Sequence, residues 1–119
     1  MTLPGLPSDA PRAGDRFPWM KLRFAFDGPV EDLFQRLDDT RFTLLVFDTA
    51  APHGPVSVAG LRTEVIPDNP HNAAELARAR ITRPSSYLLR PDGHVGLCGR
   101  MLDAAALARY FNDTLRWRR

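Results

Sequence analysis

Residues 83–100, RPSSYLLRPDGHVGLCGR, contain two short apolar runs on either side of a Pro-Asp-Gly tripeptide. Proline, aspartate and glycine in this order are typical of a tight turn, and apolar runs beside such a turn are typical of paired strands. The segment therefore predicts an antiparallel β-hairpin with its turn at 91–93. Pro84 stands directly before the first strand and marks the point at which that strand begins.

Three further segments have the patterns of strands. FTLLVF (42–47) is a continuous apolar run, which predicts a strand covered on both faces. KLRFAF (21–26) places its apolar residues on one face, which predicts a half-buried strand. LRTEVI (61–66) predicts another strand, and the Pro-Asp-Asn-Pro sequence that follows marks its end.

Three segments have apolar residues at helical spacing. The first is 30–39, VEDLFQRLDD, with two acidic residues in its expected first turn. The second is 73–80, for which Asn72 and Glu75 form a capping box. The third follows Asp103, a candidate N-cap. The apolar residues on these faces are Val30, Leu33, Phe34, Leu37, Leu76, Ala77, Ile81, Leu107, Phe111 and Leu115.

The alternation of these strands and helices predicts an α/β fold. A parallel pair of strands needs a crossover connection, whereas the 83–100 hairpin is antiparallel, so the sheet is mixed. We expect four to five strands flanked by helices, and the closing hairpin followed by a helix narrows the arrangement to a thioredoxin-like one.

The first 18 residues have a different composition from the rest. They contain Pro4, Pro7, Pro11 and Pro18, which favour extended backbone without internal hydrogen bonds. We therefore expect a Pro-rich N-terminal arm at 1–18 and a single thioredoxin-like domain at 19–119.

The charge of the chain argues against several classes of partner. Sixteen basic residues against fourteen acidic ones give a net charge of +2, and no basic stripe follows any one element, so nucleic-acid binding is not expected. No apolar run is long enough to span a membrane, and the N-terminus lacks the apolar core of a signal peptide. We expect a cytoplasmic protein.

The thioredoxin-like arrangement directs attention to the proline before the central hairpin. In that fold a cis proline at this position faces the loop after the first parallel strand, and the resemblance implies a cis Arg83–Pro84 bond. Redox members carry their cysteines in that loop, which here reads DTAAPH from Asp48 to His53. Cys98 is the only cysteine in the sequence and lies elsewhere, so the sequence excludes thiol–disulfide exchange at this loop.

The polar residues expected at this edge form a candidate cluster. Its members are Asp48, Thr49, His53, Arg83, Pro84 and Ser85. An acid, an imidazole and a hydroxyl from Ser85 or Ser86 could form a catalytic group only within hydrogen-bond reach of one another, and the sequence favours separate loop residues instead. The three histidines are too widely spaced for a metal site, and we expect neither a metal nor a cofactor in this chain.

Three phrases together resemble one known module. PRAGDRFPWMKL, LFQRLDDTRFTLLVF and SSYLLRPDGHVGLCGR are similar to parts of the C-terminal thioredoxin-like domain of FAD-dependent aromatic hydroxylases, which act on phenols and polyketides. The match covers about residues 11–112. Two departures are a short, proline-broken segment at 50–60 and the sequence Leu-Cys-Gly-Arg at 97–100, where the family has an aromatic–Arg ending.

The resemblance implies a restrained function. In those hydroxylases FAD and the substrate pocket belong to preceding domains, and the C-terminal domain serves packing and subunit association. We therefore expect a non-catalytic module, stand-alone or excised, that forms a homodimer or docks on a flavoprotein monooxygenase. One alternative is a protein that binds small aromatic or polyketide ligands in a cleft beside Pro84. The other is a cysteine-independent enzyme at the edge formed by Asp48, His53 and Pro84.

Overall fold

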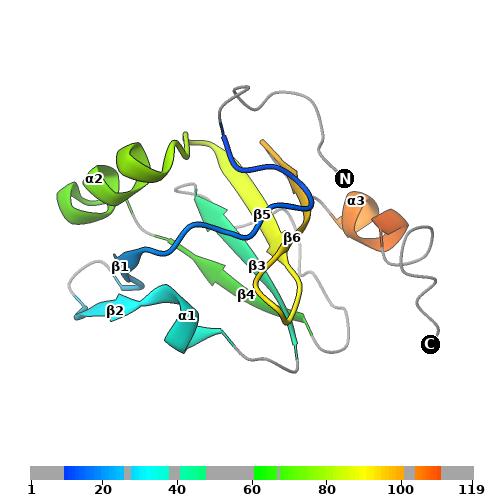
Figure 1. Cartoon of the computed structure of the whole chain (residues 1–119), viewed down its shortest axis with the longest axis horizontal. Helices are drawn as coiled ribbons and strands as arrows, with labels where there is room; N and C mark the ends of the chain where they lie inside the picture. Colours follow the sequence, from blue (N-terminus) through cyan, green and yellow to red (C-terminus); the bar gives the residue numbers. More distant parts are fainter. Residues whose placement is uncertain are drawn as a thin grey trace.

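The computed structural model describes residues 10–25, 28–37, 41–47, 61–66, 68–100 and 104–110 (Figure 1). The elements in these residues follow one another as β1 (Lys21–Arg23), β2 (Val30–Asp32), α1 (Leu33–Arg36), β3 (Phe42–Phe47), β4 (Leu61–Val65), α2 (Pro70–Ala79), β5 (Ser85–Leu89), β6 (Val95–Gly99) and α3 (Ala104–Arg109).

The apolar run at β3 forms an internal strand of a four-stranded mixed sheet. The strand order is β4-β3-β5-β6, in which β3 is parallel to β4 and antiparallel to β5, and β5 is antiparallel to β6. Residues Thr43–Phe47 are buried because elements cover both faces of the sheet. The α/β fold with a mixed sheet flanked by helices is therefore confirmed, and it is consistent with a small thioredoxin-like domain.

Two apolar clusters lie on opposite faces of this sheet. On one face, α2 and residues 10–20 cover a large cluster, and in Figure 1 the blue segment crosses in front of the strands. On the other face, Leu107 and Tyr110 of the α3 region pack on a smaller one. The first cluster contains Phe17, Met20, Leu22, Leu33, Leu45, Phe47, Ile66, Leu76, Ile81, Tyr87, Leu89, Val95 and Cys98, and the second contains Leu44, Val46, Leu88, Leu97, Leu107 and Tyr110.

The described part of the predicted arm, residues 10–18, lies along the 83–100 hairpin. The backbone N–H of Gly14 donates to Val95 O at 2.8 Å, and Val95 N–H donates to Asp15 O at 2.8 Å. Phe17 N–H donates to Gly93 O, and the Phe17 side chain is only 1% exposed. Gly93 has φ +85° at the predicted turn, a conformation that glycine adopts without strain. A boundary at residue 18 stays a prediction.

The helix predicted at 30–39 is wrong over its first residues. Val30–Asp32 is the strand β2, which pairs antiparallel with β1, and the helix α1 begins only at Leu33. Asp32 is the N-cap, since its side chain accepts a hydrogen bond from Phe34 N–H. Pairing with β1 outweighs the helical spacing of the apolar residues.

The helix predicted at 73–80 also begins earlier. α2 starts at Pro70, and its N-cap is Asn69, whose side chain accepts a hydrogen bond from Asn72 N–H. The expected capping box at Asn72 and Glu75 is therefore wrong. Pro70 occupies the first turn, where its missing N–H leaves no donor unsatisfied. Arg80, with φ 62°, ends the helix in the left-handed conformation.

Two further expectations fall largely on described residues, the strand at 21–26 and the turn at 91–93. The strand predicted at 21–26 ends at Arg23, and it pairs with β2 in a separate two-stranded ribbon, here called the β1–β2 ribbon. The turn at 91–93 and the strands beside it are confirmed. Asp103, Phe111, Leu115 and the segment 50–60 lie outside the described residues.

Candidate functional site

The predicted cis bond is present between Arg83 and Pro84, directly before β5. Ser85, the first residue of β5, pairs with Phe47, the last residue of β3. The proline therefore lies at the end of the central strand from which the expected loop departs, as the thioredoxin-like resemblance implies.

The Arg83 side chain contacts two residues that follow β4, the strand parallel to β3. Its Nη1 donates to Ile66 O at 3.1 Å, and its Nε lies 3.7 Å from Asp68 Oδ1. Only 19% of the Arg83 side chain is exposed. In the described part of the chain, Arg83 thus fastens the end of β4 to the cis-proline turn, which is a structural role.

The two serines of this edge point to opposite faces of the sheet, because neighbouring residues of a strand do so. Ser85 is fully buried, and its Oγ has no hydrogen-bond partner among the described residues, whereas Ser86 is 4% exposed. Only one of the two hydroxyls can therefore lie on a given face of the sheet. Asp48, Thr49 and His53 lie outside the described residues, so the structure places only Arg83, Pro84 and Ser85 of the predicted cluster.

Cys98 lies on the neighbouring strand β6, next to Gly99, which pairs with Ser86, and the two described histidines bond to other residues. Cys98 is buried in β6 opposite Tyr87, with its Sγ 3.9 Å from Pro11 O. His71 Nε2 is 2.8 Å from Lys21 O, and His94 Nδ1 is 3.2 Å from Asp92 Oδ1. Within the described ranges, no group of three or more metal-ligating side chains comes together.

Tyr87 is the largest fully buried side chain of the described core. Its ring lies 5.1 Å from that of Phe17 and 6.1 Å from that of Phe47, measured between centroids. No described residue forms a hydrogen bond with its hydroxyl. Burial raises the pKa of this phenol well above its ordinary value of 10.0, with a smaller contribution from Cys98.

A second group of polar contacts joins α2 to the β1–β2 ribbon. Glu75 accepts a hydrogen bond from Lys21 N–H at 2.9 Å, and His71 donates from Nε2 to Lys21 O, which places a proton on that nitrogen. Asn72 Oδ1 accepts from Arg23 N–H at 2.8 Å, and its Nδ2 donates to Arg23 O at 2.9 Å. The side chains of α2 therefore satisfy the backbone of β1 where a third strand would otherwise pair.

The other side of this ribbon carries an exposed tryptophan that is held in place. Trp19 is 47% exposed, and its Nε1–H donates to Asp32 Oδ2 at 2.9 Å. The ammonium of Lys21 lies 5.6 Å from the centre of the Trp19 ring, a cation–π arrangement. The Trp19 hydrogen bond is the largest of the effects that lower the pKa of Asp32.

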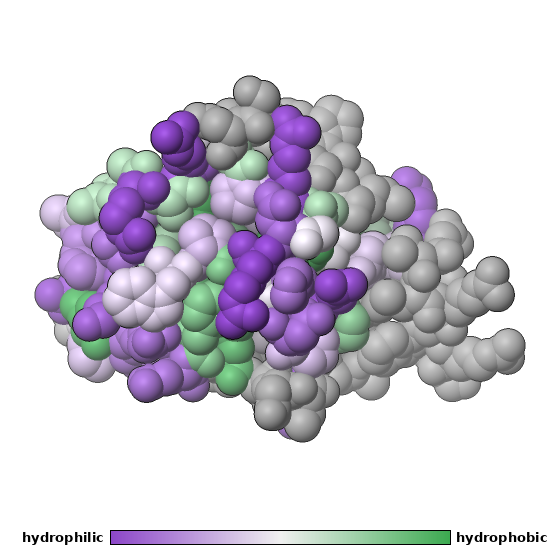
Figure 2. Space-filling view, viewed as in Figure 1, coloured by the Kyte–Doolittle hydropathy of each residue, from purple (hydrophilic) through white to green (hydrophobic). Residues whose placement is uncertain are grey.

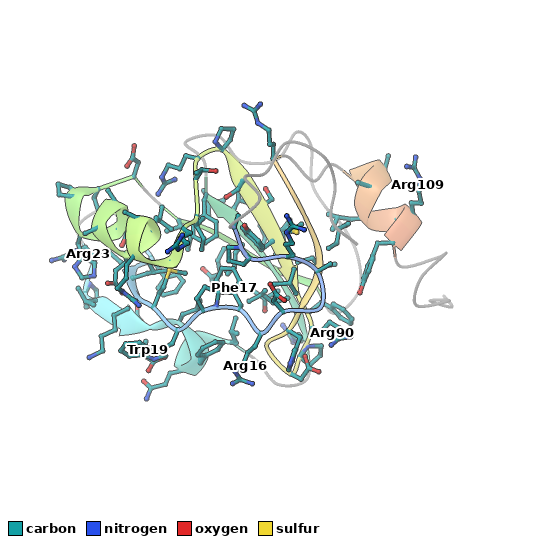
Figure 3. The ribbon with its side chains drawn as sticks, turned by 45° about the horizontal axis from the view of Figure 1, so that its top comes forward. Arg16, Phe17, Trp19, Arg23, Arg90 and Arg109 are labelled. Atoms are coloured by element: carbon teal, nitrogen blue, oxygen red, sulfur yellow. The ribbon has the colours of Figure 1, made fainter. Side chains whose placement is uncertain are left out.

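Arg16 forms a similar contact nearby. Its guanidinium carbon lies 5.2 Å from the centre of the Phe34 ring on α1. Figure 3 shows Arg16 and Trp19 on the same side of the molecule. Figure 2 shows apolar residues among polar ones on this side, in the region of α1 and β2. Sequence reasoning did not find the roles of Lys21 and Asp32, because their contacts with Trp19 depend on how β1 pairs with β2.

Comparisons with known proteins add one finding. No protein-family model matches the chain, and a search of curated proteins found no match either. A solved structure does match: the crystal structure of a ternary complex of aklavinone-11 hydroxylase with FAD and aklavinone. The superposition has a TM-score of 0.67, covers 92% of this chain and aligns residues that are 23% identical. The two proteins share a fold.

The shared fold concerns one part of the hydroxylase, because this chain spans 22% of that protein's length. At this level of identity the likeness carries the fold but not the hydroxylase's ligands or reaction. The expected relation to FAD-dependent hydroxylases is therefore confirmed at the level of the fold, and the assignment to their C-terminal domain stays a prediction. Among the described helices, none is long and apolar enough to cross a membrane.

Proposed function

We propose that this chain is a non-catalytic thioredoxin-like module, related to the C-terminal domain of flavin-dependent aromatic hydroxylases, that docks on a flavoprotein monooxygenase or forms a homodimer. The observation that carries the proposal is the fold shared with about a fifth of a hydroxylase whose complex contains FAD and aklavinone. A module of that size acts by contact with the rest of such an enzyme. FAD would be held by the partner and not by this chain. The complex would lie in the cytoplasm.

The chemistry of the described residues supports a non-catalytic role. Thioredoxin-like redox activity needs a thiolate at the end of the central strand, and the single cysteine is buried in β6 instead. Arg83 is engaged by Ile66 O and Asp68. No acid–base pair within hydrogen-bond reach of Ser85 occurs in the described part of this edge.

The two alternatives remain predictions. A cleft for aromatic or polyketide ligands beside Pro84 depends on the segment 50–60, and an enzyme at this edge depends on Asp48 and His53. The segment 50–60, Asp48 and His53 lie outside the residues that the structure describes. Calorimetry with aromatic ligands and a His53→Ala variant would test them separately.

The experiment for the leading proposal measures association directly. The tagged chain is used to capture proteins from its source cells. A captured protein counts as a flavoprotein if it releases FAD on denaturation. The complex must then re-form from the two purified components. Sedimentation of the purified chain across a range of concentrations tests for a homodimer. A reconstituted complex or a dimer supports the proposal, whereas a monomer at every concentration with no flavoprotein recovered contradicts it.

A further inference from the structure

Among the described residues, one edge of the β1–β2 ribbon is covered and the other edge is open. On the covered edge, the backbone N–H and C=O of both Lys21 and Arg23 bond to side chains of α2. In an antiparallel pair, the backbone groups of successive residues point alternately to opposite sides. Those of Leu22 therefore point toward β2, where Leu22 pairs with Glu31.

The same alternation fixes the direction of the β2 backbone. Since Glu31 points toward β1, the N–H and C=O of Val30 and the N–H of Asp32 point away from it. The hydrogen bond from Leu33 N–H to Met20 O, at 2.9 Å, fits this register. No hydrogen bond from these outward groups of β2 to any described residue is found. An unpaired strand edge of this kind is a template for one more strand.

The side chains next to this open edge have the composition of a binding surface. Residues directly opposite one another in a ladder share a face, so Lys21 and Asp32 lie on one face with Val30. Trp19 joins them through its hydrogen bond to Asp32. We call this set, Trp19, Lys21, Val30 and Asp32, the Trp19 face. Trp19 and Val30, 47% and 39% exposed, are the two large apolar side chains that stand clearly exposed in the described part of the chain.

The Trp19 ring is already fixed in position before any partner binds. Asp32 holds its indole nitrogen, Lys21 lies over its ring, and Arg78 donates to its backbone oxygen at 3.0 Å. When a partner contacts the ring, the Trp19 side chain therefore loses little conformational entropy. Tryptophans that become buried on binding are common among the residues that dominate binding energy.

The charges around the Trp19 face favour an acidic partner. The carboxylates of Asp32 and Glu75 already accept hydrogen bonds from within the chain. The cations of Lys21 and Arg16 lie over aromatic rings, and neither makes an ion pair with a described residue, although the charge of Lys21 contributes to the lowered pKa of Asp32. Carboxylates on a partner would complement these two cations.

We propose that the open edge of β2 and the Trp19 face bind an extended, acidic segment of a partner protein, which adds to the ribbon as a strand beside Val30. The backbone of the segment pairs with Val30, its apolar side chains contact Trp19 and Val30, and its carboxylates face Lys21 and Arg16. Strand addition of this kind supplies affinity from the backbone and selectivity from the side chains. The inference deepens the proposed docking function and rests on it.

The test uses a random peptide library displayed on phage, selected against the full chain. Peptides rich in acidic and apolar residues are expected to be enriched. Selected peptides are synthesised, and their affinities are measured by fluorescence anisotropy. Lys21→Glu is expected to weaken binding about tenfold, and added salt is expected to weaken it too. Arg109→Glu makes the same charge change on α3, which Figure 3 shows far from Trp19, and is expected to leave binding unchanged.

A second variant tests the strand edge itself. Val30→Pro removes an N–H that points away from β1, so the ribbon should keep its ladder, since proline is tolerated on the open side of an edge strand. Binding should be lost in Val30→Pro and largely kept in Val30→Thr, which restores the N–H. Circular dichroism shows whether Val30→Pro is folded. If it unfolds, the same edge is tested with two sets of peptides, N-methylated at odd or at even positions. The set that loses the N–H groups facing β2 should not bind.

Each outcome separates this inference from the docking function. Failure to enrich any peptide, enrichment of basic peptides, or equal binding by Lys21→Glu would overturn the inference. A flavoprotein complex that persists in Lys21→Glu and Val30→Pro would keep the docking function and reject this surface. Sedimentation that finds a dimer in the wild-type chain and a monomer in Val30→Pro would place a second copy at the open edge, which would also reject an acidic partner segment.

Discussion

Asn72 of α2 makes both hydrogen bonds that a neighbouring strand would make to Arg23 of β1. Its side-chain oxygen accepts from the backbone N–H at 2.8 Å, and its side-chain nitrogen donates to the backbone C=O at 2.9 Å. Asn72 is fully buried, so neither bond can be replaced by water without a rearrangement. The helix thereby closes one edge of the ribbon and leaves the other edge open.

Replacing Asn72 with Ala should destabilise the protein by about 2–3 kcal/mol. The change removes two hydrogen bonds and leaves the N–H and C=O of Arg23, which are partly buried, without these partners. Chemical denaturation measures the loss. Ala74→Ser lies on the exposed side of the same helix and should change the free energy of unfolding by less than about 0.5 kcal/mol. Equal stability of the two variants would show that Asn72 does not hold the ribbon.

Much of the sheet could be predicted from the sequence, because its signals are local. The apolar run at β3 and the Pro-Asp-Gly turn each determine their own element. β2 could not be predicted this way, since Val30 and Leu33 share helical spacing, and only pairing with β1 makes Val30 extended. The start of α2 carried a readable signal: Asn69 is followed by Pro70, the usual order of an N-cap and the first helical residue.

The candidate site shows the same division. Pro84 was found by its place before an apolar strand, and the cis bond followed from the resemblance. The contacts of Arg83 with Ile66 and Asp68 depend on how the end of β4 approaches the turn, which no local pattern encodes. The Trp19 face could not be predicted for the same reason, since Trp19 meets Asp32 only through the pairing of β1 with β2.

Phe17→Ala should destabilise the protein by about 3–5 kcal/mol, as for other buried phenylalanines. Phe17 is 1% exposed and packs against Tyr87 and Phe47, although it falls within the Pro-rich segment at the N-terminus. Thermal or chemical denaturation measures the change. Phe17→Leu keeps most of the apolar volume and should cost clearly less. A loss of under about 1 kcal/mol in Phe17→Ala would mean that residues 10–18 are dispensable for the core.

Gly96→Ala should destabilise the contact between β6 and the α3 region by about 1–3 kcal/mol. A Cβ at this position would overlap the hydroxyl of Tyr110 and lie 3.0 Å from the ring carbon that carries it. Tyr110→Phe removes the overlapping oxygen. In a double-mutant cycle, the cost of Gly96→Ala should therefore be smaller in the Tyr110→Phe background. Additive effects of the two substitutions would show that Tyr110 does not lie over Gly96.

The buried hydroxyl of Tyr87 should make the protein less stable at alkaline pH. Its pKa is raised by burial, so the unfolded chain loses this proton near pH 10 while the folded protein keeps it. The full stability is therefore present below about pH 10 and falls as the pH rises above that value. Tyr110 is also expected to contribute, since burial raises its pKa too.

Tyr87→Phe isolates this effect. The Tyr87 hydroxyl has no hydrogen-bond partner among the described residues, so its removal should leave stability at about pH 8 unchanged or slightly higher. At about pH 11 the variant should be more stable than the wild type by a clearly larger margin, because the unfolded state no longer gains from ionisation. Denaturation at both pH values measures the two differences. A constant difference would mean that the phenol ionises equally in both states, and therefore that Tyr87 is accessible to water in the fold.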